Sequence, residues 1–232
     1  MMHILKAQQF DREFLNELFK MATILEHRPY AYADTMDSEP HPIMASLFYE
    51  PSTRTRFSFE AAMLKLRGEV LSTENAEQFS SAAKGEILED TIRVVSGYSS
   101  VIVLRHPEEG AAERAANVSS VPIINAGDGT GQHPTQSLID LYTIQKECNE
   151  IDGKLTKYDV KHIYLVAPDF VQMKPELITH LDKHNVSWST CNRLKDIASE
   201  VDVFYQTRLQ KERFRTGSFE LFEEYQKIAH RY

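Results

Sequence analysis

Apolar residues along the chain alternate between helical spacing and short continuous runs. From Asp11, which can cap a helix, they recur at helical spacing until Pro29, so a first helix is predicted there. Ile43 to Tyr49 is instead a continuous apolar run with a proline close behind, as is typical of a strand buried on both faces of a parallel sheet. A second helix is predicted from Thr53 to Leu66.

The alternation of strands and helices continues through the rest of the chain. Further helices are predicted at 86–98, 109–117, 135–148, 174–184 and 192–200, and further strands at 101–105, 121–126, 163–167, 186–190 and 201–207. This order indicates an α/β fold with mainly parallel sheets flanked by helices. The polar segment 149–157 is predicted to be a hinge between two domains, 1–148 and 149–232.

Composition excludes several classes of function. The formal net charge of −8 argues against a nucleic-acid partner, which normally meets a basic surface. No apolar run approaches the roughly 18 residues of a membrane span, and Met1 to Phe10 do not resemble a secretory signal. Cys148 and Cys191, with no cysteine or histidine pair at metal-ligand spacing, indicate a reducing, cytoplasmic location and no metal site.

The segment Ser52-Thr53-Arg54-Thr55-Arg56 follows a predicted buried strand and begins a predicted helix. The unpaired backbone N–H groups and the positive dipole end of such a helix bind anions, and hydroxyls with Arg54 would complete the site. An ordinary helix cap followed by solvent-facing arginines explains the same residues about equally well.

A second candidate site is the glycine-rich loop from Gly127 to Gln136, at the carboxyl end of a predicted strand. That edge of an open sheet is where ligands bind. His133 could donate a hydrogen bond to a carbonyl oxygen, and Gln136 could accept one from an amide, although a lone histidine in a turn is more often structural. Arg105, at the end of another predicted strand, is expected at the same edge.

Two long motifs carry a resemblance to a known family. The stretch from Phe48 to Glu60 resembles the carbamoyl phosphate signature of the aspartate/ornithine carbamoyltransferase family, and Gly127 to Gln136 is similar to its second signature. The Gly-Asp-Gly opening of the second motif resembles the aspartate branch of the family. The resemblance continues to Gly153 and again from Lys157 to about Phe214.

The resemblance implies transfer of the carbamoyl group of carbamoyl phosphate to the amino group of L-aspartate, giving N-carbamoyl-L-aspartate and phosphate in de novo pyrimidine biosynthesis. Such transfer needs a neutralised leaving group and a polarised carbonyl, and no cofactor. The implied catalytic residues are Arg54, Thr55, Lys84, Arg105 and His133. The implied substrate-binding residues are Ser52, Thr53, Arg54, Thr55, Ser80, Lys84, Arg105, His133, Gln136, Arg208 and Gln210.

Within these sets, the residues from Ser52 to Thr55 would hold the phosphate together with Arg105. Thr55, Arg105 and His133 would donate to the carbonyl oxygen, and Gln136 would hold the carbamoyl nitrogen. The resemblance also implies a homotrimer in which Ser80 and Lys84 reach a neighbouring subunit's site, and it places Arg208 and Gln210 on the aspartate side-chain carboxylate. Regulatory chains or a dihydroorotase are further partners that it leaves open.

The sequence departs from the family in its second domain. Between Leu155 and Lys157 the family has a strand, an arginine-bearing loop for the acceptor's α-carboxylate and most of a helix, where only Thr156 stands here, and it continues beyond Tyr232. Three explanations are open: segments of the protein are omitted from this sequence, the protein is truncated, or it is a diverged non-catalytic relative. The intact signature residues favour omitted segments. A carbamoyltransferase for another amino acceptor, or a non-catalytic binding or assembly protein, therefore stays open as an alternative function.

Overall fold

The chain forms two compact units, residues 1–161 and 162–232. The computed structural model describes residues 2–33, 41–74, 85–148, 160–167 and 172–206. The expected hinge at 149–157 lies outside these ranges, so the proposed domain boundary remains a prediction. No helix in the described part of the chain is long and apolar enough to cross a membrane.

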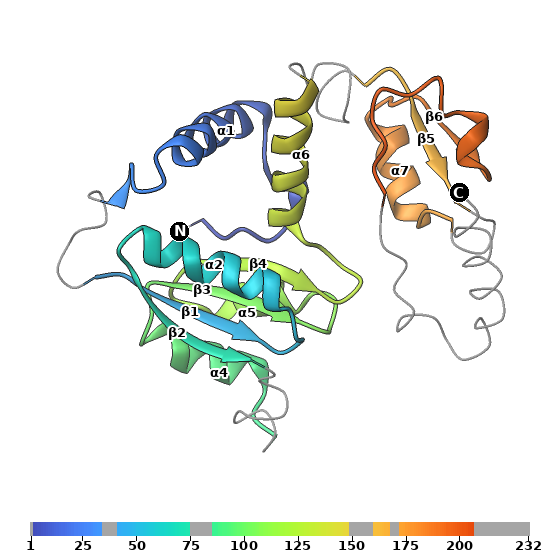
Figure 1. The fold of residues 1–232 in the computed structure, drawn as a ribbon. Helices are drawn as coiled ribbons and strands as arrows, with labels where there is room; N and C mark the ends of the chain where they lie inside the picture. The colour runs from blue at the N-terminus through green and yellow to red at the C-terminus, as the bar shows by residue number, and fades with distance from the viewer. Residues whose placement is uncertain (1, 34–40, 75–84, 149–159, 168–171, 207–232) are drawn as a thin grey trace. The chain divides into compact units, whose positions relative to one another are not determined.

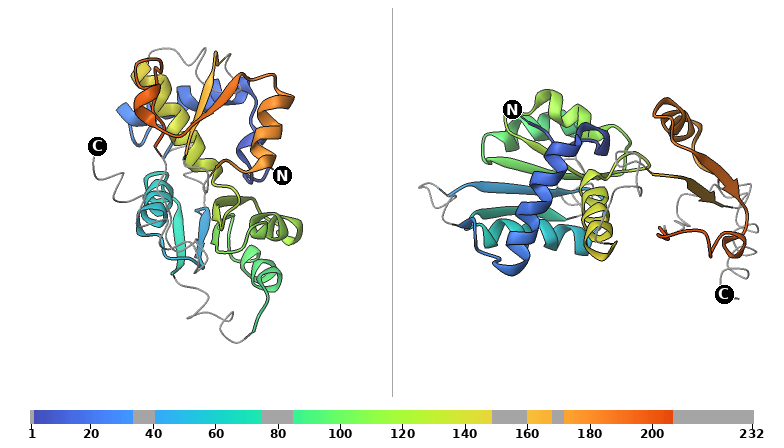
Figure 2. Two further views of the ribbon diagram at one scale, coloured as in Figure 1. Left: turned by 90° about the vertical axis from the view of Figure 1, so that its right-hand side faces the viewer. Right: turned by 90° about the horizontal axis from the view of Figure 1, so that it is seen from above.

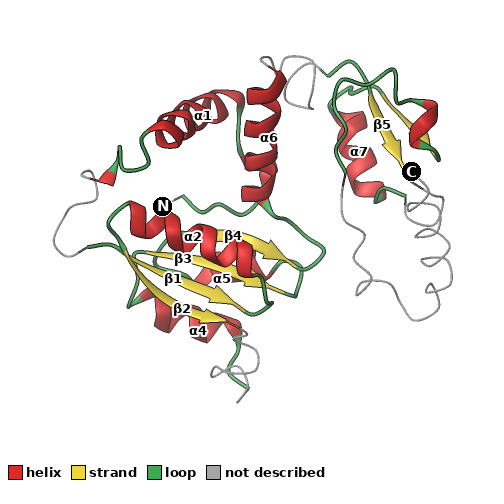
Figure 3. Ribbon diagram, in the orientation of Figure 1, coloured by secondary structure: helices red, strands yellow, loops and turns green. Residues whose placement is uncertain are grey.

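A parallel four-stranded sheet forms the centre of the first unit (Figures 1 and 3). Its strands lie in the order β2-β1-β3-β4, with bounds β1 Ile43–Phe48, β2 Glu69–Glu74, β3 Val101–His106 and β4 Ile123–Asp128. All three neighbouring pairs are parallel, which confirms the predicted fold class. The carboxyl ends of β1, β3 and β4 therefore lie side by side.

Helices cover both faces of this sheet. The helices of the first unit are α1 Arg12–His27, α2 Thr53–Lys65, α4 Leu88–Ser96, α5 Ala111–Val118 and α6 Pro134–Cys148, preceded by the short 3-10 helix η1, Ala7–Gln9. Seen from the side, α2 covers one face of the sheet and α4 and α5 cover the other (Figure 2). The predicted helices of this unit are thus confirmed, with ends shifted by up to two residues.

Strand β1 shows why the layers form. Its side chains alternate between the two faces, because successive residues of a strand point in opposite directions. Ala45 and Leu47 are buried with residues of α4 and α5, whereas Met44 and Phe48 are buried with Met63 of α2. Burying a side chain of this size contributes roughly 1.5–3 kcal/mol, so a continuous apolar strand stabilises both layers at once.

Helix α1 packs against α6. The Asp11 side chain accepts a hydrogen bond from the backbone N–H of Phe14 (2.8 Å), which fixes the predicted helix start. Leu15 and Phe19 are buried on the inner face of α1 and contact Leu138 and Leu141 of α6. This contact holds α6, the helix that begins directly after the glycine-rich loop.

The second unit is described in part. It contains the parallel pair β5 (Ile163–Val166) and β6 (Trp188–Cys191), the helix α7 (Pro175–Lys183) and a short 3-10 helix η5 (Leu194–Asp196). The predicted strand and helix order is confirmed up to β6.

Two expectations fail, and one strand was missed. Strand β2 was not predicted, because its sequence is polar and, as an edge strand, it buries little: Val70 is half-buried and Leu71 is 48% exposed. The helix expected at 192–200 is wrong: only the turn Leu194–Asp196 is helical, since a short segment with one buried apolar residue, Ile197, cannot stabilise an α-helix. The strand expected at 201–207 is also wrong over 201–206, where Phe204 and Tyr205 are exposed.

Candidate active site

The candidate site lies at the carboxyl ends of three adjacent strands. In the register of the sheet Phe48 of β1 is level with Arg105 of β3, and the backbone N–H of Tyr49 donates to the carbonyl oxygen of Arg105 (2.9 Å). On the other side of β3, strand β4 ends at Asp128 within the glycine-rich loop. The helix start after β1, Arg105 and the loop after β4 are therefore neighbours, as expected for ligand sites of open parallel sheets.

The start of α2 has backbone N–H groups that donate to no acceptor within the described ranges. The first intrahelical bond runs from the N–H of Arg56 to the carbonyl of Ser52 (3.0 Å), so the N–H groups of residues 53–55 precede it. Ser52 makes no side-chain cap bond. The Arg54 side chain is exposed and pairs with no acid among the described residues. This arrangement favours an anion site over an ordinary helix cap, because the Ser52 side chain does not cap the helix.

Polar contacts deeper in α2 tie it to the sheet. The Glu60 carboxylate accepts from the hydroxyl of Ser46 on β1 (3.0 Å) and from that of Ser72 on β2 (2.6 Å). Arg56 forms an ion pair with Glu74 at the end of β2 (2.9 Å). Ser46 is fully buried, so its hydroxyl requires this partner. These bonds hold the helix start at a fixed height above the strand ends.

Arg105 is held in place by two contacts. Its Nη1 donates to the backbone carbonyl of Ala126 (3.0 Å), and its Nη2 lies 3.1 Å from a carboxylate oxygen of Glu50. Gly127 allows this approach: its φ is +116°, and a Cβ there would lie 2.8 Å from Nη1 of Arg105 and 3.5 Å from the His133 ring. The arginine and the histidine are thus brought against the same stretch of backbone.

Asp128 organises the glycine-rich loop. Its buried carboxylate accepts from the N–H of Gln132 within the loop (2.6 Å) and from the N–H of Gly110 at the start of α5 (3.0 Å). Gly129 follows with a φ of +58°, where a Cβ would collide with the carbonyl oxygen of Pro107. One carboxylate therefore links the loops after β3 and β4.

His133 is half-buried and neutral at neutral pH. Burial, with the nearby Arg105 guanidinium, lowers the pKa of His133 to about 4. Its Nδ1 accepts from the backbone N–H of Gln136 (3.4 Å) and lies 3.3 Å from the hydroxyl of Thr135. The same N–H also donates to the carbonyl oxygen of His133 (3.1 Å). Because a backbone N–H can only donate, we assign the single proton of the neutral ring to Nε2. Nε2 is thus a hydrogen-bond donor.

Gln136 lies in the first turn of α6 with an exposed side chain. Its Nε2 donates to a carboxylate oxygen of Asp140, one turn further along the helix (2.9 Å). The amide oxygen of Gln136 is the group that can accept a hydrogen bond from an amide nitrogen.

The structure brings part of the predicted site together. The residues Ser52, Thr53, Arg54, Thr55, Arg105, His133 and Gln136 lie at the three adjacent strand ends. The residues Ser80, Lys84, Arg208 and Gln210 lie outside the described ranges, so their roles stay predictions. Sequence reasoning gave no role to Glu50, Asp128 or Asp140, although an aspartate between glycines is a usual sign of a side chain that binds loop N–H groups.

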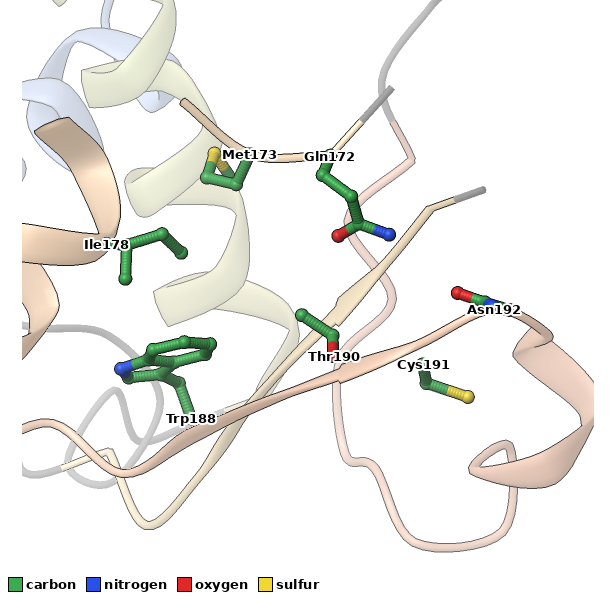
Figure 4. Close-up of a pocket in the computed structure, with 7 residues that line it drawn as sticks. All are labelled: Gln172, Met173, Ile178, Trp188, Thr190, Cys191 and Asn192. Atoms are coloured by element: carbon green, nitrogen blue, oxygen red, sulfur yellow. The ribbon is translucent and has the colours of Figure 1, made fainter. Parts of the chain in front are cut away.

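A cavity of about 540 Å³ lies elsewhere, in the second unit (Figure 4). Met173, Ile178 and Trp188 line it together with polar uncharged residues that include Thr190 and Asn192. The described residues that line this cavity include no cation that could bind a carboxylate or a phosphate. We therefore place the candidate site in the first unit.

The fold and site define a class: an α/β domain with a candidate anion site at the carboxyl edge of its sheet and a neutral histidine beside that site. The comparison with known families agrees. Residues 2–146 match the family described as "Aspartate/ornithine carbamoyltransferase, carbamoyl-P binding domain". The chain belongs to the aspartate/ornithine carbamoyltransferase family.

Relatives and solved structures support this assignment. The chain is 50% identical to aspartate carbamoyltransferase 3, chloroplastic, of Pisum sativum, over 91% of this chain and 59% of that protein. It is 43% identical to the aspartate carbamoyltransferase catalytic subunit of Archaeoglobus fulgidus, over 100% of this chain and 80% of the relative. The aspartate transcarbamoylase of Trypanosoma cruzi, in complex with carbamoyl phosphate and aspartate, superposes with a TM-score of 0.83 at 34% identity, covering 95% of this chain and 76% of that one.

The chain is shorter than these relatives. It spans about 60% of the length of the pea enzymes that it matches. The alignment with the A. fulgidus relative runs over 252 positions, whereas this chain has 232 residues, so the relative holds residues within the aligned region that this sequence lacks. This agrees with the departure from the family pattern noted in the sequence.

Proposed function

We propose that this chain is the catalytic polypeptide of an aspartate carbamoyltransferase, which makes N-carbamoyl-L-aspartate and phosphate. The observation that carries the proposal is the meeting, at one sheet edge, of the α2 anion site, Arg105 and a neutral His133. Carbamoyl phosphate needs these groups: cations for a dianionic leaving group and neutral donors for a carbonyl oxygen.

Each group has a task in the proposed reaction. The uncharged amine of the acceptor attacks the carbonyl carbon, and negative charge moves onto the carbonyl oxygen. Thr55, Arg105 and the Nε2–H of His133 donate hydrogen bonds to that oxygen. The C–O bond to phosphate then breaks, and the electron pair leaves with phosphate, which Arg54, Arg105 and the N–H groups of α2 stabilise. The amine nitrogen gives up its proton to the departing phosphate or to solvent.

His133 does not serve as the base in this scheme. Its Nδ1 lone pair is directed at the N–H of Gln136, and Nε2 carries the ring proton. A neutral ring in this state has no lone pair to offer to an amine. His133 therefore polarises the carbonyl group, and catalysis depends on position and electrostatics, with no cofactor.

We assign the acceptor side by similarity. The T. cruzi relative was solved with carbamoyl phosphate and aspartate together, and Arg208 and Gln210 would hold the aspartate side-chain carboxylate here, as Arg is suited to bidentate carboxylate binding. Ser80 and Lys84 would add a cation from a neighbouring subunit.

A homotrimer with shared sites is part of the proposal. Large apolar side chains are exposed on α2, β2, α4 and their flanking turns: Phe57, Leu64, Leu71, Ile87, Val94 and Tyr98. Large exposed apolar areas mark protein interfaces, and we propose that these side chains contact neighbouring subunits. The archaeal relative is named a catalytic subunit, and we propose that this chain too works within a larger assembly, with regulatory chains or a dihydroorotase as further partners. The cytoplasmic location stays a prediction, because the pea relative is chloroplastic by name.

A direct assay tests the proposal. The purified chain is mixed with carbamoyl phosphate and L-aspartate or L-ornithine, and carbamoylated product is measured, with the Arg54→Ala variant as control. The proposal is supported if the unaltered chain forms product with aspartate and the Arg54→Ala variant does not. Product with ornithine alone indicates the other acceptor branch. Binding of carbamoyl phosphate without product indicates the non-catalytic binding protein, and absence of both overturns the proposed site.

A further inference from the structure

The contact between Gln136 and Asp140 fixes which end of the Gln136 amide faces Asp140. An amide can point either way, since its oxygen and nitrogen are similar in size. A carboxylate, however, can only accept hydrogen bonds. The 2.9 Å contact with Asp140 therefore requires the NH₂ group of Gln136 to face Asp140 and the amide oxygen to face away from it.

We propose that Asp140 is a positioning residue that makes Gln136 present an acceptor, and so selects a carbamoyl group over acyl groups of the same shape. This inference rests on the proposed function. The NH₂ of a carbamoyl group has two donors and no strong acceptor, so it needs an oxygen opposite it. A methyl group in its place gains nothing from that oxygen. A carboxylate oxygen in its place is repelled.

The position of Asp140 in α6 supports this role. His133, Gln136 and Asp140 are spaced three and four residues apart, so they lie along one face at the start of the helix. Asp140 is also close enough to His133 to affect the pKa of the histidine. Its negative charge raises that pKa, whereas burial and Arg105 lower it. The Gln136 side chain is exposed, so packing does not fix its amide, and the bond to Asp140 does.

A purely structural role is the alternative. A glutamine and an aspartate four residues apart stabilise an isolated helix slightly. Loss of such a pair would lower stability and weaken every ligand of the site alike. It would not change the preference between a ligand with an NH₂ group and one with a methyl group.

Three stable ligands separate the two roles. Phosphonoacetamide carries the NH₂ group, 2-oxopropylphosphonate carries a methyl group in its place, and inorganic phosphate lacks both. Binding of each is measured by calorimetry to the full chain and to Asp140→Asn, whose amide can donate as well as accept. Glu147→Gln, which removes one carboxylate charge further along the same helix, is the matched control.

We expect Asp140→Asn to bind phosphonoacetamide about 5- to 10-fold more weakly, as for loss of one hydrogen bond. Binding of phosphate and of the methyl ligand should stay within about twofold or tighten, because a negative charge is removed. Glu147→Gln should leave the preference unchanged. In a Gln136→Ala background, Asp140→Asn should have no further effect on phosphonoacetamide.

The outcomes are distinguishable. If the unaltered chain binds neither phosphate nor phosphonoacetamide, the proposed function fails, and this inference with it. If the unaltered chain prefers phosphonoacetamide and Asp140→Asn keeps that preference, this inference alone is wrong. An equal loss for all three ligands, or the same loss without Gln136, shows that Asp140 only stabilises the helix.

Discussion

A carboxylate oxygen of Glu50 lies 3.1 Å from the guanidinium of Arg105, so the cation at the end of β3 is already paired with an acid. Both side chains are largely shielded, with 15% of Arg105 and 34% of Glu50 exposed. An incoming phosphate must compete with Glu50 for this arginine. The pair thus limits anion affinity while it holds Arg105 in place.

Glu50→Gln should therefore bind inorganic phosphate several-fold more tightly. The amide removes the competing charge, while the bond from Arg105 to the Ala126 carbonyl keeps the guanidinium in position. Calorimetry at low ionic strength measures the effect. Glu108→Gln, which removes a charge paired with Arg114 nearby, is the control and should change affinity much less. Weaker phosphate binding in Glu50→Gln would show that Glu50 serves mainly to orient Arg105.

His133→Ala should lower kcat on the order of 100-fold, which corresponds to about 2.7 kcal/mol of lost transition-state stabilisation. Phosphate binding should survive, because the α2 anion site is intact. Arg54→Ala should reduce both catalysis and phosphate binding, since it removes leaving-group neutralisation. Steady-state kinetics with phosphate inhibition separates the two effects. A kcat for His133→Ala within about twofold of the unaltered chain would remove His133 from the mechanism.

The His133 ring should titrate near pH 4, which NMR can follow through its ring protons. Arg105→Ala should raise this pKa but leave it below 6.5, because burial is the larger cause. In the unfolded chain the ring binds its proton near pH 6.5, so the folded state loses stability as pH falls from about 6.5 to about 4. A midpoint close to 6.5 in the folded chain would contradict the buried, neutral state.

Ser46→Ala should destabilise the first unit by about 1–2 kcal/mol, since it removes a buried donor from the Glu60 carboxylate. Urea unfolding followed by circular dichroism measures the change. Thr143→Ala removes an exposed hydroxyl that bonds only within its own helix, and it should cost less than about 0.5 kcal/mol. Equal effects of the two substitutions would mean that the Glu60 contacts do not anchor α2.

Mixed oligomers should test shared sites. Arg54→Ala and Lys84→Ala chains are each expected to be nearly inactive alone. If Lys84 acts in a neighbouring subunit's site, mixed trimers contain some sites with both residues intact, so activity should rise above that of either parent. Mixing after dissociation and reassembly, with each parent treated alone as the control, provides the measurement. No gain in the mixture would rule out sharing.

Local patterns in the sequence determined much of this protein. The Asp11 cap, the continuous apolar run of β1 and the Ser52 to Thr55 helix start were all predicted, because each depends on residues within one or two turns of each other. The same is true of the two signature motifs, whose described residues lie together at the carboxyl edge of the sheet, as the sequence predicted. Strand β2 was missed, since a polar edge strand forms only when β1 supplies its hydrogen-bond partners.

Only the tertiary structure decided how distant groups meet. The order β1-β3-β4 places Glu50 against Arg105 and the Gly127 backbone against both Arg105 and His133. Those contacts leave His133 half-buried beside a cation and so lower its pKa, which cannot be predicted from the local sequence. Asp128 likewise joins N–H groups from two loops that are 22 positions apart along the chain, at Gly110 and Gln132. The pKa and the hydrogen bonds of a side chain depend on the residues near it in space, and strand pairing determines which residues those are.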